Sequence, residues 1–209
     1  GLFRFVEPSL MESLPALDPD SPNLADWRSV AATILVVTRA QVTGAEMTVD
    51  LKVGHVESGQ AMASKRYSGR ADNPRMFAHQ ASDEVTALTQ NKGVARTRIV
   101  FTSDRDATKE NRSKELYIVD YDGFNPRRVT VNRKLNILPA WSPDGRSLAY
   151  VSYRTGGPDI FRASIFEGTS ANLTNGAGQN FAPSFSPDGK RIAYASTRSG
   201  NMEIWIANA

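Results

Sequence analysis

The side chains most suited to catalysis lie together in one short stretch that contains His79, Ser82 and Asp83. Serine hydrolases use these three residue types, but they bring them together from separate elements and place the serine on a sharp strand-to-helix turn. Here the histidine and the aspartate are four residues apart, so a helix places them one turn apart on the same element. The chain also lacks a Gly-x-Ser-x-Gly sequence. We therefore interpret the stretch as a solvated helix face and expect no catalytic residue and no enzymatic activity.

The remaining candidate ligands for a metal or a cofactor are scattered. The other histidine, His55, stands alone at the end of an alternating stretch, and a single histidine does not form a metal site. Asp144 and Asp188 each belong to a Ser-Pro-Asp-Gly sequence and lack the alternating acidic spacing of a calcium loop. The glycine pairs lie in turns rather than at helix starts, so they do not form a phosphate loop. We expect no metal site and no cofactor.

The composition is that of an ordinary globular chain. Of 209 residues 40% are apolar and 22% are charged, and the net charge is only +3. The arginines are scattered rather than clustered, which argues against a nucleic-acid groove. The longest apolar run, residues 34–37, is far shorter than the roughly 18 residues of a membrane helix. The chain has no cysteine and opens without Met or a signal peptide, which we expect of a processed or trimmed protein.

A five-residue motif, an aromatic residue followed by Ser-Pro-Asp-Gly, occurs twice. Trp141–Gly145 reads Trp-Ser-Pro-Asp-Gly, and Phe185–Gly189, 44 residues later, reads Phe-Ser-Pro-Asp-Gly. The residues after each copy also match. Ser-Pro-Asp-Gly has the composition of a tight turn, because proline fixes φ, aspartate bonds the backbone ahead and glycine accepts a positive φ. Self-similarity at 40–45 residues, with several short strands in each unit, is typical of β-propeller blades.

Each repeat contains further strand-like stretches, and a third, degenerate repeat begins at Ile99. The spacing predicts two nearly complete blades and most of a third. The link after the first strand of the first unit, residues 106–114, is polar and predicts a surface loop. The later strands of the units are predicted at residues 115–119, 159–163 and 203–207, and at 128–130 and 172–174.

The first part of the chain has a different pattern. Residues 33–42 form a continuous apolar run that predicts a buried strand, and residues 46–56 alternate like a half-buried strand. A hairpin partner is expected at residues 60–67, and a short strand at residues 2–6. Ser21-Pro22 and Asp72-Asn73-Pro74 are typical helix starts. After the second start an apolar stripe follows at helical spacing, in Phe77, Ala81, Val85 and Leu88.

These patterns predict two domains. We expect an α/β domain at residues 1–94, with a mixed sheet and two helices, followed by an all-β propeller at residues 95–209 with about three blades. In the helix predicted after Ser21-Pro22, we expect Trp27 to be a core anchor, that is, to pack in the core of the domain. A propeller must close to hide its edge strands, so about three blades leave open edges.

Two equivalent segments come before the Ser-Pro-Asp-Gly turns, at residues 136–140 and 180–184, and we expect both to be exposed loops at one end of the propeller channel. Apolar side chains rimmed by polar ones suit a protein partner. The alternative is that Ile137, Leu138 or Phe181 packs between adjacent blades. The candidate partner-binding residues are Gln179, Asn180, Phe181, Ala182, Asn136 and Leu138.

The chain resembles the TolB family over nearly its whole length. The resemblance rests on Ala78–Val85, which reads Ala-His-Gln-Ala-Ser-Asp-Glu-Val, on Asp120–Asn125, and on the segments that lead into the two Ser-Pro-Asp-Gly turns. It implies an α/β domain packed on a six-bladed propeller, without enzymatic activity or a cofactor. It also implies a periplasmic scaffold of the Tol–Pal system that serves outer-membrane integrity and cell division. The runner-up interpretation is the non-catalytic propeller of a serine peptidase whose hydrolase domain lies elsewhere.

The implied partners are proteins, not nucleic acids. The resemblance implies binding to the lipoprotein Pal, and to colicins, through loops at one end of the propeller. It implies binding to TolA through an N-terminal segment that has no counterpart in this chain. The family's Pal-binding stretch reads His-Asn-x-Ala-Pro; here Asn180, Ala182 and Pro183 match, but Gln179 replaces the histidine. The family's last three or so blades have no counterpart either, so we expect self-association through open blade edges, most simply as a dimer. The rival is a monomer with a frayed third blade.

Overall fold

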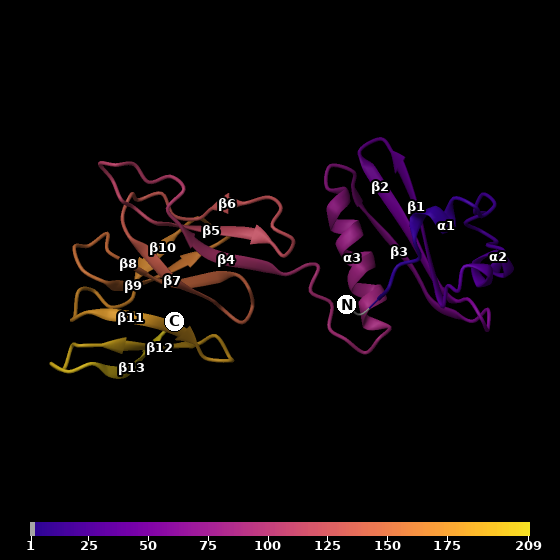
Figure 1. The fold of residues 1–209 in the computed structure, drawn as a ribbon. Coiled ribbons are helices and arrows are strands. Elements are labelled where there is room, and N and C mark those ends of the chain that lie inside the picture. The colour runs from indigo at the N-terminus through magenta and orange to yellow at the C-terminus, as the bar shows by residue number, and fades with distance from the viewer. Residues whose placement is uncertain (1–2) are drawn as a thin grey trace. The chain divides into compact units, whose positions relative to one another are not determined.

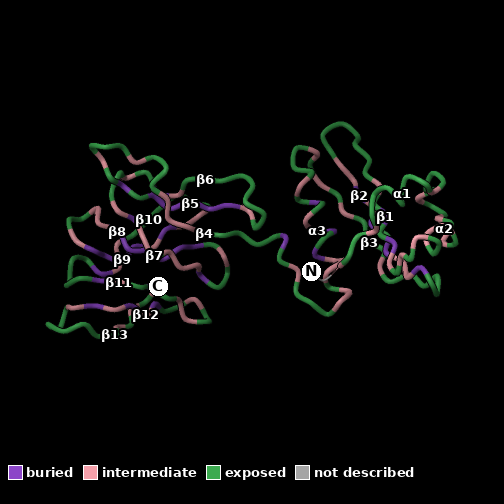
Figure 2. The backbone as a smooth tube through the Cα atoms, in the orientation of Figure 1, coloured by how far each residue is buried: buried purple, intermediate pink, exposed green. Residues whose placement is uncertain are grey.

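The computed structural model describes residues 3–209. The chain separates into two compact units, the first ending at Arg96 and the second beginning at Thr97 (Figure 1). Each unit has its own buried apolar clusters, which Figure 2 shows as purple segments of the backbone. Within the described residues, none of the helices combines the length and the apolar character needed to cross a membrane.

The first unit is built on a three-stranded sheet in the order β1 (Ile34–Thr43), β2 (Glu46–His55), β3 (Ala61–Arg70). Both pairings are antiparallel, so the expectation of a mixed sheet is wrong for the described strands. The cause is the short connections: β1 and β2 are joined by a tight turn in which Gly44 has φ of +60°, and a parallel pair needs a crossover of a dozen or more residues.

Helix α3 (Pro74–Ala87) covers one face of this sheet. It starts as predicted, because the Asn73 side chain accepts a hydrogen bond from the Met76 N–H at 3.3 Å and proline occupies the first turn. Phe77 and Ala81 are buried. With Val85 and Leu88, Ala81 packs against the sheet cluster of Leu51 and Val53, so the predicted apolar stripe is confirmed.

The other helices begin at places that the sequence did not indicate. Helix α2 (Leu24–Ser29) is capped by Asn23, whose side chain accepts from the Ala25 N–H at 3.2 Å, and not by Ser21. Asparagine can accept from the same backbone N–H groups as serine. The start of the helix is set by packing, because α2 places Trp27 against Leu35 and Val37. Helix α1 (Pro8–Met11) occupies a stretch that was expected to be a loop.

Two strand predictions in the first unit need correction. Residues 3–6 form no strand, and Leu2 lies outside the described residues. Strand β1 is not buried throughout: Leu35 and Val37 are buried, but Val36 between them is 42% exposed. Successive residues of a strand point to opposite faces of the sheet. Leu35 and Val37 pack against Trp27 of α2, whereas Val36 lies on the other face, beside Val53, in the edge strand.

The second unit contains three blades. Blade 2 is complete, with the strand order β10-β9-β8-β7, while the described strands of blades 1 and 3 number three each, in the orders β4-β5-β6 and β11-β12-β13. The strands are β4 (Arg98–Ser103), β5 (Glu115–Asp120) and β6 (Arg127–Arg128) in blade 1; β7 (Asn136–Trp141), β8 (Ser147–Ser152), β9 (Asp159–Ser164) and β10 (Ser170–Asn172) in blade 2; and β11 (Asn180–Phe185), β12 (Arg191–Ser196) and β13 (Glu203–Asn208) in blade 3.

Apolar side chains fill the space between neighbouring blades. Leu116 of blade 1 packs with Tyr150 and Phe161 of blade 2, and all three are at most 2% exposed. On the other side of blade 2, Ile160 packs with Ile192 of blade 3. The predicted propeller fold with about three blades is therefore confirmed.

The segments at residues 136–140 and 180–184 are not loops. They form the inner strands β7 and β11, which pair with β8 and β12. Each carries a bulge, where Leu138 and Ala182 have φ of +53° and +50°. The prolines at positions 139 and 183 suggested loops, but proline is tolerated in a strand where a bulge already interrupts the hydrogen-bond ladder.

Candidate functional site

Because the strands of each blade are antiparallel, the connections between them divide into two sets. The turn end carries the Ser-Pro-Asp-Gly turns and the connections β5–β6 and β9–β10, at residues 121–126, 142–146, 165–169 and 186–190. The opposite end, here called the junction end, carries residues 104–114, 129–135, 153–158, 173–179 and 197–202. Gln179 belongs to the junction end, next to the start of β11.

Two of the candidate partner-binding residues join blades to each other. Asn136 and Asn180 are completely buried. The Asn180 amide nitrogen lies 3.3 Å from the Pro158 carbonyl and 3.3 Å from an Asp159 carboxylate oxygen of the preceding blade. The expectation that both asparagines are exposed to a partner is therefore wrong. A buried amide needs hydrogen-bond partners, and the preceding blade supplies them to the Asn180 amide nitrogen.

The same contact occurs one blade earlier. The Asn136 amide donates to the Lys114 carbonyl at 3.0 Å and to Glu115 Oε2 at 3.1 Å. We call this arrangement the junction clasp: an asparagine that begins an inner strand, β7 or β11, bound to the carboxylate that begins β5 or β9 in the blade before. The signal for it was in the sequence, because positions 115, 159 and 203 are all acidic and 44 residues apart.

Asp159 accepts more hydrogen bonds than Glu115, the other carboxylate of the clasps. Its Oδ1 accepts from the Thr174 hydroxyl at 2.7 Å and the Gly176 N–H at 3.0 Å, and its Oδ2 accepts from the Thr155 hydroxyl at 2.8 Å. Burial opposes ionisation of this carboxyl, but the hydrogen bonds from Thr174, Thr155 and neighbouring groups outweigh burial and lower its pKa. Asp159 is therefore a structural anion.

The other four candidates are divided between core and surface. Phe181 packs against the core shared by blades 2 and 3, as does Ile137, which confirms the alternative of packing between blades for these two. Leu138 is 48% exposed, and Ala182 and Gln179 are also exposed. The Gln179 backbone is fixed by bonds with Thr197 at 2.9 and 3.1 Å. The structure thus offers Leu138, Gln179 and Ala182 to a partner, and their role in binding stays a prediction.

The stretch with His79, Ser82 and Asp83 is a structural element. Asp83 is 9% exposed and accepts from the Ala95 N–H and from Arg96 Nε, both at 2.8 Å. Burial raises the pKa of Asp83, but these bonds outweigh it and lower the pKa overall. The solvated-face interpretation is wrong for Asp83, which ties α3 to the segment after it. The His79 ring lies 3.4 Å from the Arg75 guanidinium.

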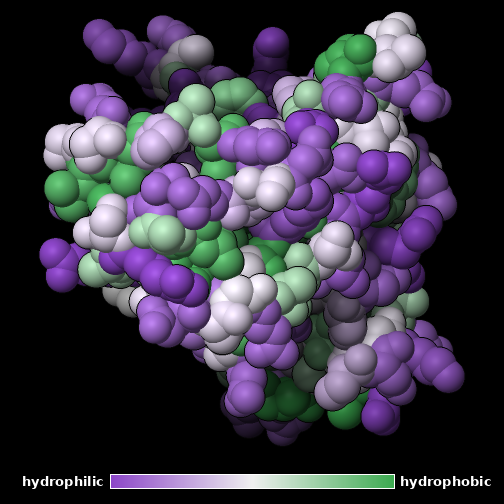
Figure 3. All heavy atoms as spheres, turned by 90° about the vertical axis from the view of Figure 1, so that its right-hand side faces the viewer, coloured by the Kyte–Doolittle hydropathy of each residue, from purple (hydrophilic) through white to green (hydrophobic). Residues whose placement is uncertain are grey.

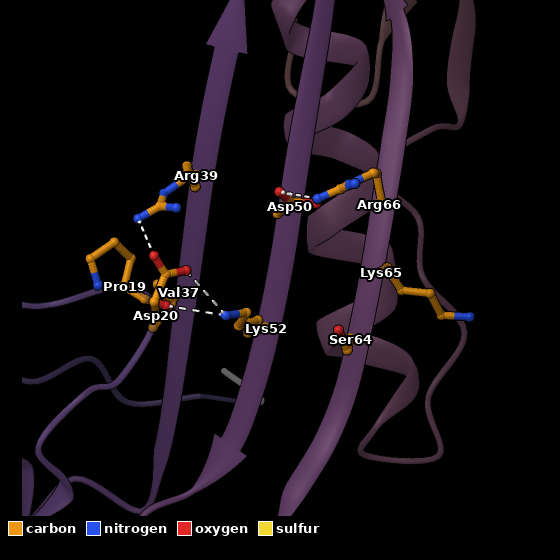
Figure 4. A pocket seen from close by; sticks show the side chains of 9 residues that line it. All are labelled: Pro19, Asp20, Val37, Arg39, Asp50, Lys52, Ser64, Lys65 and Arg66. Carbon is orange, nitrogen blue, oxygen red and sulfur yellow. Dashed lines mark hydrogen bonds and ion pairs between the residues drawn. The ribbon is translucent and has the colours of Figure 1, made fainter.

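A hollow of about 420 Å³ lies on the first unit's sheet, on the face away from α3 (Figure 4). Its charges are already matched. Asp20 lies 2.9 Å from Arg39 and 3.6 Å from Lys52, and Arg66 forms two bonds to Asp50 at 2.5 and 3.0 Å. The bond from Arg66 lowers the pKa of Asp50. Figure 3, which looks at the molecule from this side, shows hydrophilic side chains interspersed with smaller hydrophobic groups.

The acidic and histidine side chains are dispersed in both units. Within residues 3–209, His, Asp and Glu form no group of three that could hold a metal ion. The junction clasps, for example, hold one carboxylate each, and hydrogen-bond donors of the protein surround it.

Comparisons with known proteins agree with this architecture. The family profile described as the TolB beta propeller domain matches residues 85–209. The Tol-Pal system protein TolB of Desulfosudis oleivorans is 36% identical over 143 residues, which is 68% of this chain and 32% of the relative. The corresponding protein of Methylococcus capsulatus is 33% identical and covers 86% of this chain and 42% of its own length.

A solved structure extends the agreement to both units. TolB from Acinetobacter baumannii matches with a TM-score of 0.81 and 30% identity, over 94% of this chain and 50% of that chain. The chain thus spans a third to two fifths of these two curated relatives and half of this solved protein. A profile that matches more than half of the residues, together with relatives of this identity, places the chain in the TolB family.

Proposed function

We propose that this chain is a non-enzymatic binding protein of the Tol–Pal system that works in the periplasm and binds the lipoprotein Pal through the junction end of its blades. Family membership supports the system. The observation that carries the binding surface is the pair of bulges in adjacent inner strands, which expose Leu138 and Ala182 at equivalent places. Surfaces of this kind, an exposed apolar residue beside polar groups such as Gln179, suit a protein partner.

The finer roles follow the same proposal. They include binding of TolA and of colicins and a contribution to outer-membrane integrity and cell division, which are functions proposed for a protein of the relatives' full length. The absence of enzymatic activity is supported by Asp83, whose carboxylate accepts hydrogen bonds from the Ala95 N–H and from Arg96. The peptidase-propeller alternative is the weaker one, because relatives at 33–36% identity are named Tol-Pal system proteins.

The test is a bulky substitution in the exposed bulge. Ala182→Trp should weaken binding of the soluble Pal domain of the same genome by about tenfold or more, because a large side chain would prevent close approach at the centre of the surface. The control is Ala171→Trp on the outer strand β10, where alanine is also exposed. Isothermal titration calorimetry measures both, and thermal melting confirms that both variants are folded. Equal affinities for the two variants would move the Pal site elsewhere.

Self-association through blade edges stays a prediction. Ile204 and Ile206 of β13 are 76% and 62% exposed, whereas Ile160, equivalent to Ile204 in blade 2, is completely buried. Exposed apolar side chains of this size favour association with another blade face. A rise of the sedimentation coefficient with concentration would support the dimer.

A further inference from the structure

The two ends of the blade unit differ in charge. The junction-end connections contain eight Lys or Arg residues and three Asp or Glu residues, whereas the turn-end connections contain two and four. The junction-end cations are Arg105, Lys109, Arg112, Lys114, Arg133, Lys134, Arg154 and Arg198. The junction end is therefore basic, whereas the acids of the turn end share that end with the exposed Arg98 and Arg191, which begin β4 and β12 there.

Three of these cations are held in place by aromatic rings, one in each blade. Arg105 lies 4.6 Å from the ring centre of Tyr117, Arg154 lies 3.7 Å from that of Phe161, and Arg198 lies 4.9 Å from that of Trp205. The rings are 44 residues apart, so this is a repeated device. Stacking on an aromatic face orients the guanidinium and leaves its charge and its outer donors available.

The positive charge is not cancelled locally. Five further cations, Lys109, Arg112, Lys114, Arg133 and Lys134, are exposed, and none forms an ion pair with an acid among residues 3–209. Asp106 at this end is matched by Arg128 of β6 at 2.6 Å and by the Tyr117 hydroxyl. The bond from Tyr117, and then that from Arg128, lower the pKa of Asp106.

We propose that the junction end selects an acidic protein surface, and that the charge difference between the two ends orients this partner before contact. The proposal rests on the function proposed above and adds the chemistry of the partner. Charges on an open surface act over about 8–10 Å at physiological ionic strength. They therefore raise the association rate more than they strengthen the final complex. The turn end mixes acidic and basic side chains, so it does not offer the same attraction to an acidic partner in the opposite orientation.

The test compares equal charge changes at the two ends. Lys109→Glu with Lys134→Glu reverses two charges at the junction end, and Arg146→Glu with Lys190→Glu makes the same total change at the turn end. Stopped-flow mixing with the soluble Pal domain of the same genome measures association at 50 and 500 mM NaCl. The junction variant should associate about tenfold more slowly at low salt and about equally at high salt, and the turn-end variant should stay within about twofold of the wild type.

Equal effects of the two double variants, or association that does not depend on salt, would overturn the proposal while leaving Pal binding intact. If the wild-type chain does not bind Pal at all, the proposed function fails instead. In that case a poly-glutamate peptide of about 20 residues replaces Pal as the acidic probe. It is titrated into the chain, and the chemical shifts of the chain's backbone amides are measured. Shifts confined to the junction end that disappear in the junction variant keep the proposal, and shifts spread over both ends, or none, refute it.

Discussion

The two ends of the blade unit are built from the same repeat but are held in different ways. At the turn end, each hairpin is closed by its own residues: the Gly145 N–H donates to the Ser142 carbonyl at 2.9 Å, and Asp144 accepts from the Arg146 N–H at 3.0 Å. At the junction end, hairpins are closed in the same way, as by the Gly156 N–H that donates to the Tyr153 carbonyl at 3.2 Å, but further hydrogen bonds run from one blade to the next, as from Asn180 to Asp159. The turn end shapes single blades, and the junction end also joins the blades.

The difference shows where the stability of the unit is concentrated. A turn that loses one bond still has its strand ladder on both sides. A clasp that loses its carboxylate leaves several buried donors without a partner, and each costs roughly 1–3 kcal/mol. Matched substitutions at the two ends should therefore have unequal effects, and the following predictions either sharpen or contradict this contrast.

The largest effect is expected from Asp159→Ala. It removes the carboxylate that accepts from Thr174 and Gly176, and one of the acceptors of Asn180, in a site that is 2% exposed, and it should lower the free energy of unfolding by about 4 kcal/mol. The control, Asp188→Ala, removes an exposed acceptor of the turn end and should cost much less. Urea denaturation followed by circular dichroism measures both. Comparable losses would contradict the contrast.

A smaller effect is expected from two glycines with the same backbone conformation. Gly178 and Gly145 have φ of +73° and +67°, so an alanine costs about 1 kcal/mol at either position for the left-handed conformation alone. At Gly178 the added Cβ would lie 2.6 Å from the Arg198 backbone nitrogen, whereas at Gly145 it meets no atom within 4 Å. Gly178→Ala should therefore cost about 2 kcal/mol more than Gly145→Ala. Thermal melting of both variants checks the difference, which would vanish if the Thr197–Arg198 backbone can move away from position 178.

The clasp should also make part of the stability sensitive to acid. The pKa of Asp159 is lowered in the folded chain, so its ionised form stabilises the fold. This contribution is complete above the unfolded pKa of about 3.9 and is lost as the pH falls through the folded value. The stability difference between wild type and Asp159→Asn should be constant from pH 7 to pH 5 and shrink below pH about 4. Urea midpoints at each pH measure it, and a constant difference down to pH 2.5 would argue against an ionised clasp.

The smallest effect concerns the stacked arginines. Arg154 lies over the buried ring of Phe161 and also donates to the Ser170 hydroxyl at 3.0 Å, whereas Arg146 lies over Phe166, which is 63% exposed. Arg154→Lys should cost about 1 kcal/mol, because lysine keeps the charge but loses the planar stack. Arg146→Lys should cost less. Chemical denaturation of each variant beside the wild type measures the two losses of unfolding free energy. A larger loss for Arg146→Lys than for Arg154→Lys would contradict the contrast between the ends.

The sequence predicted the features that depend on neighbouring residues. Ser-Pro-Asp-Gly makes its turn with hydrogen bonds between residues at most five positions apart, and the stripe from Phe77 to Leu88 needs only helical spacing. Both follow from local chemistry, so a single sequence is sufficient to find them. The 44-residue period made the propeller architecture predictable, because similar sequence units are expected to form similar strands.

The errors arose where distant residues decide the structure. Pro139 and Pro183 suggested loops, but pairing with β8 and β12 makes their segments strands. Asn180 looked like a surface residue because asparagine usually is one, and its acceptor Asp159 lies 21 residues earlier in the chain. Asp83 likewise finds Ala95 twelve residues later. In each case the missing information was a long-range partner.

The junction clasp also gives the repeat a direction. Blade 2 offers the Asn136 amide to the blade before it and the Asp159 carboxylate to the blade after it, so the clasps run in one direction along the chain. Because the amide and the carboxylate recur every 44 residues, a tandem duplication or loss of one whole repeat would preserve every remaining junction clasp. A partial duplication would leave an amide or a carboxylate without its hydrogen-bond partner. Growth of such a protein during evolution is thereby restricted to whole units, as in other repeat arrays where each unit contacts only its neighbours.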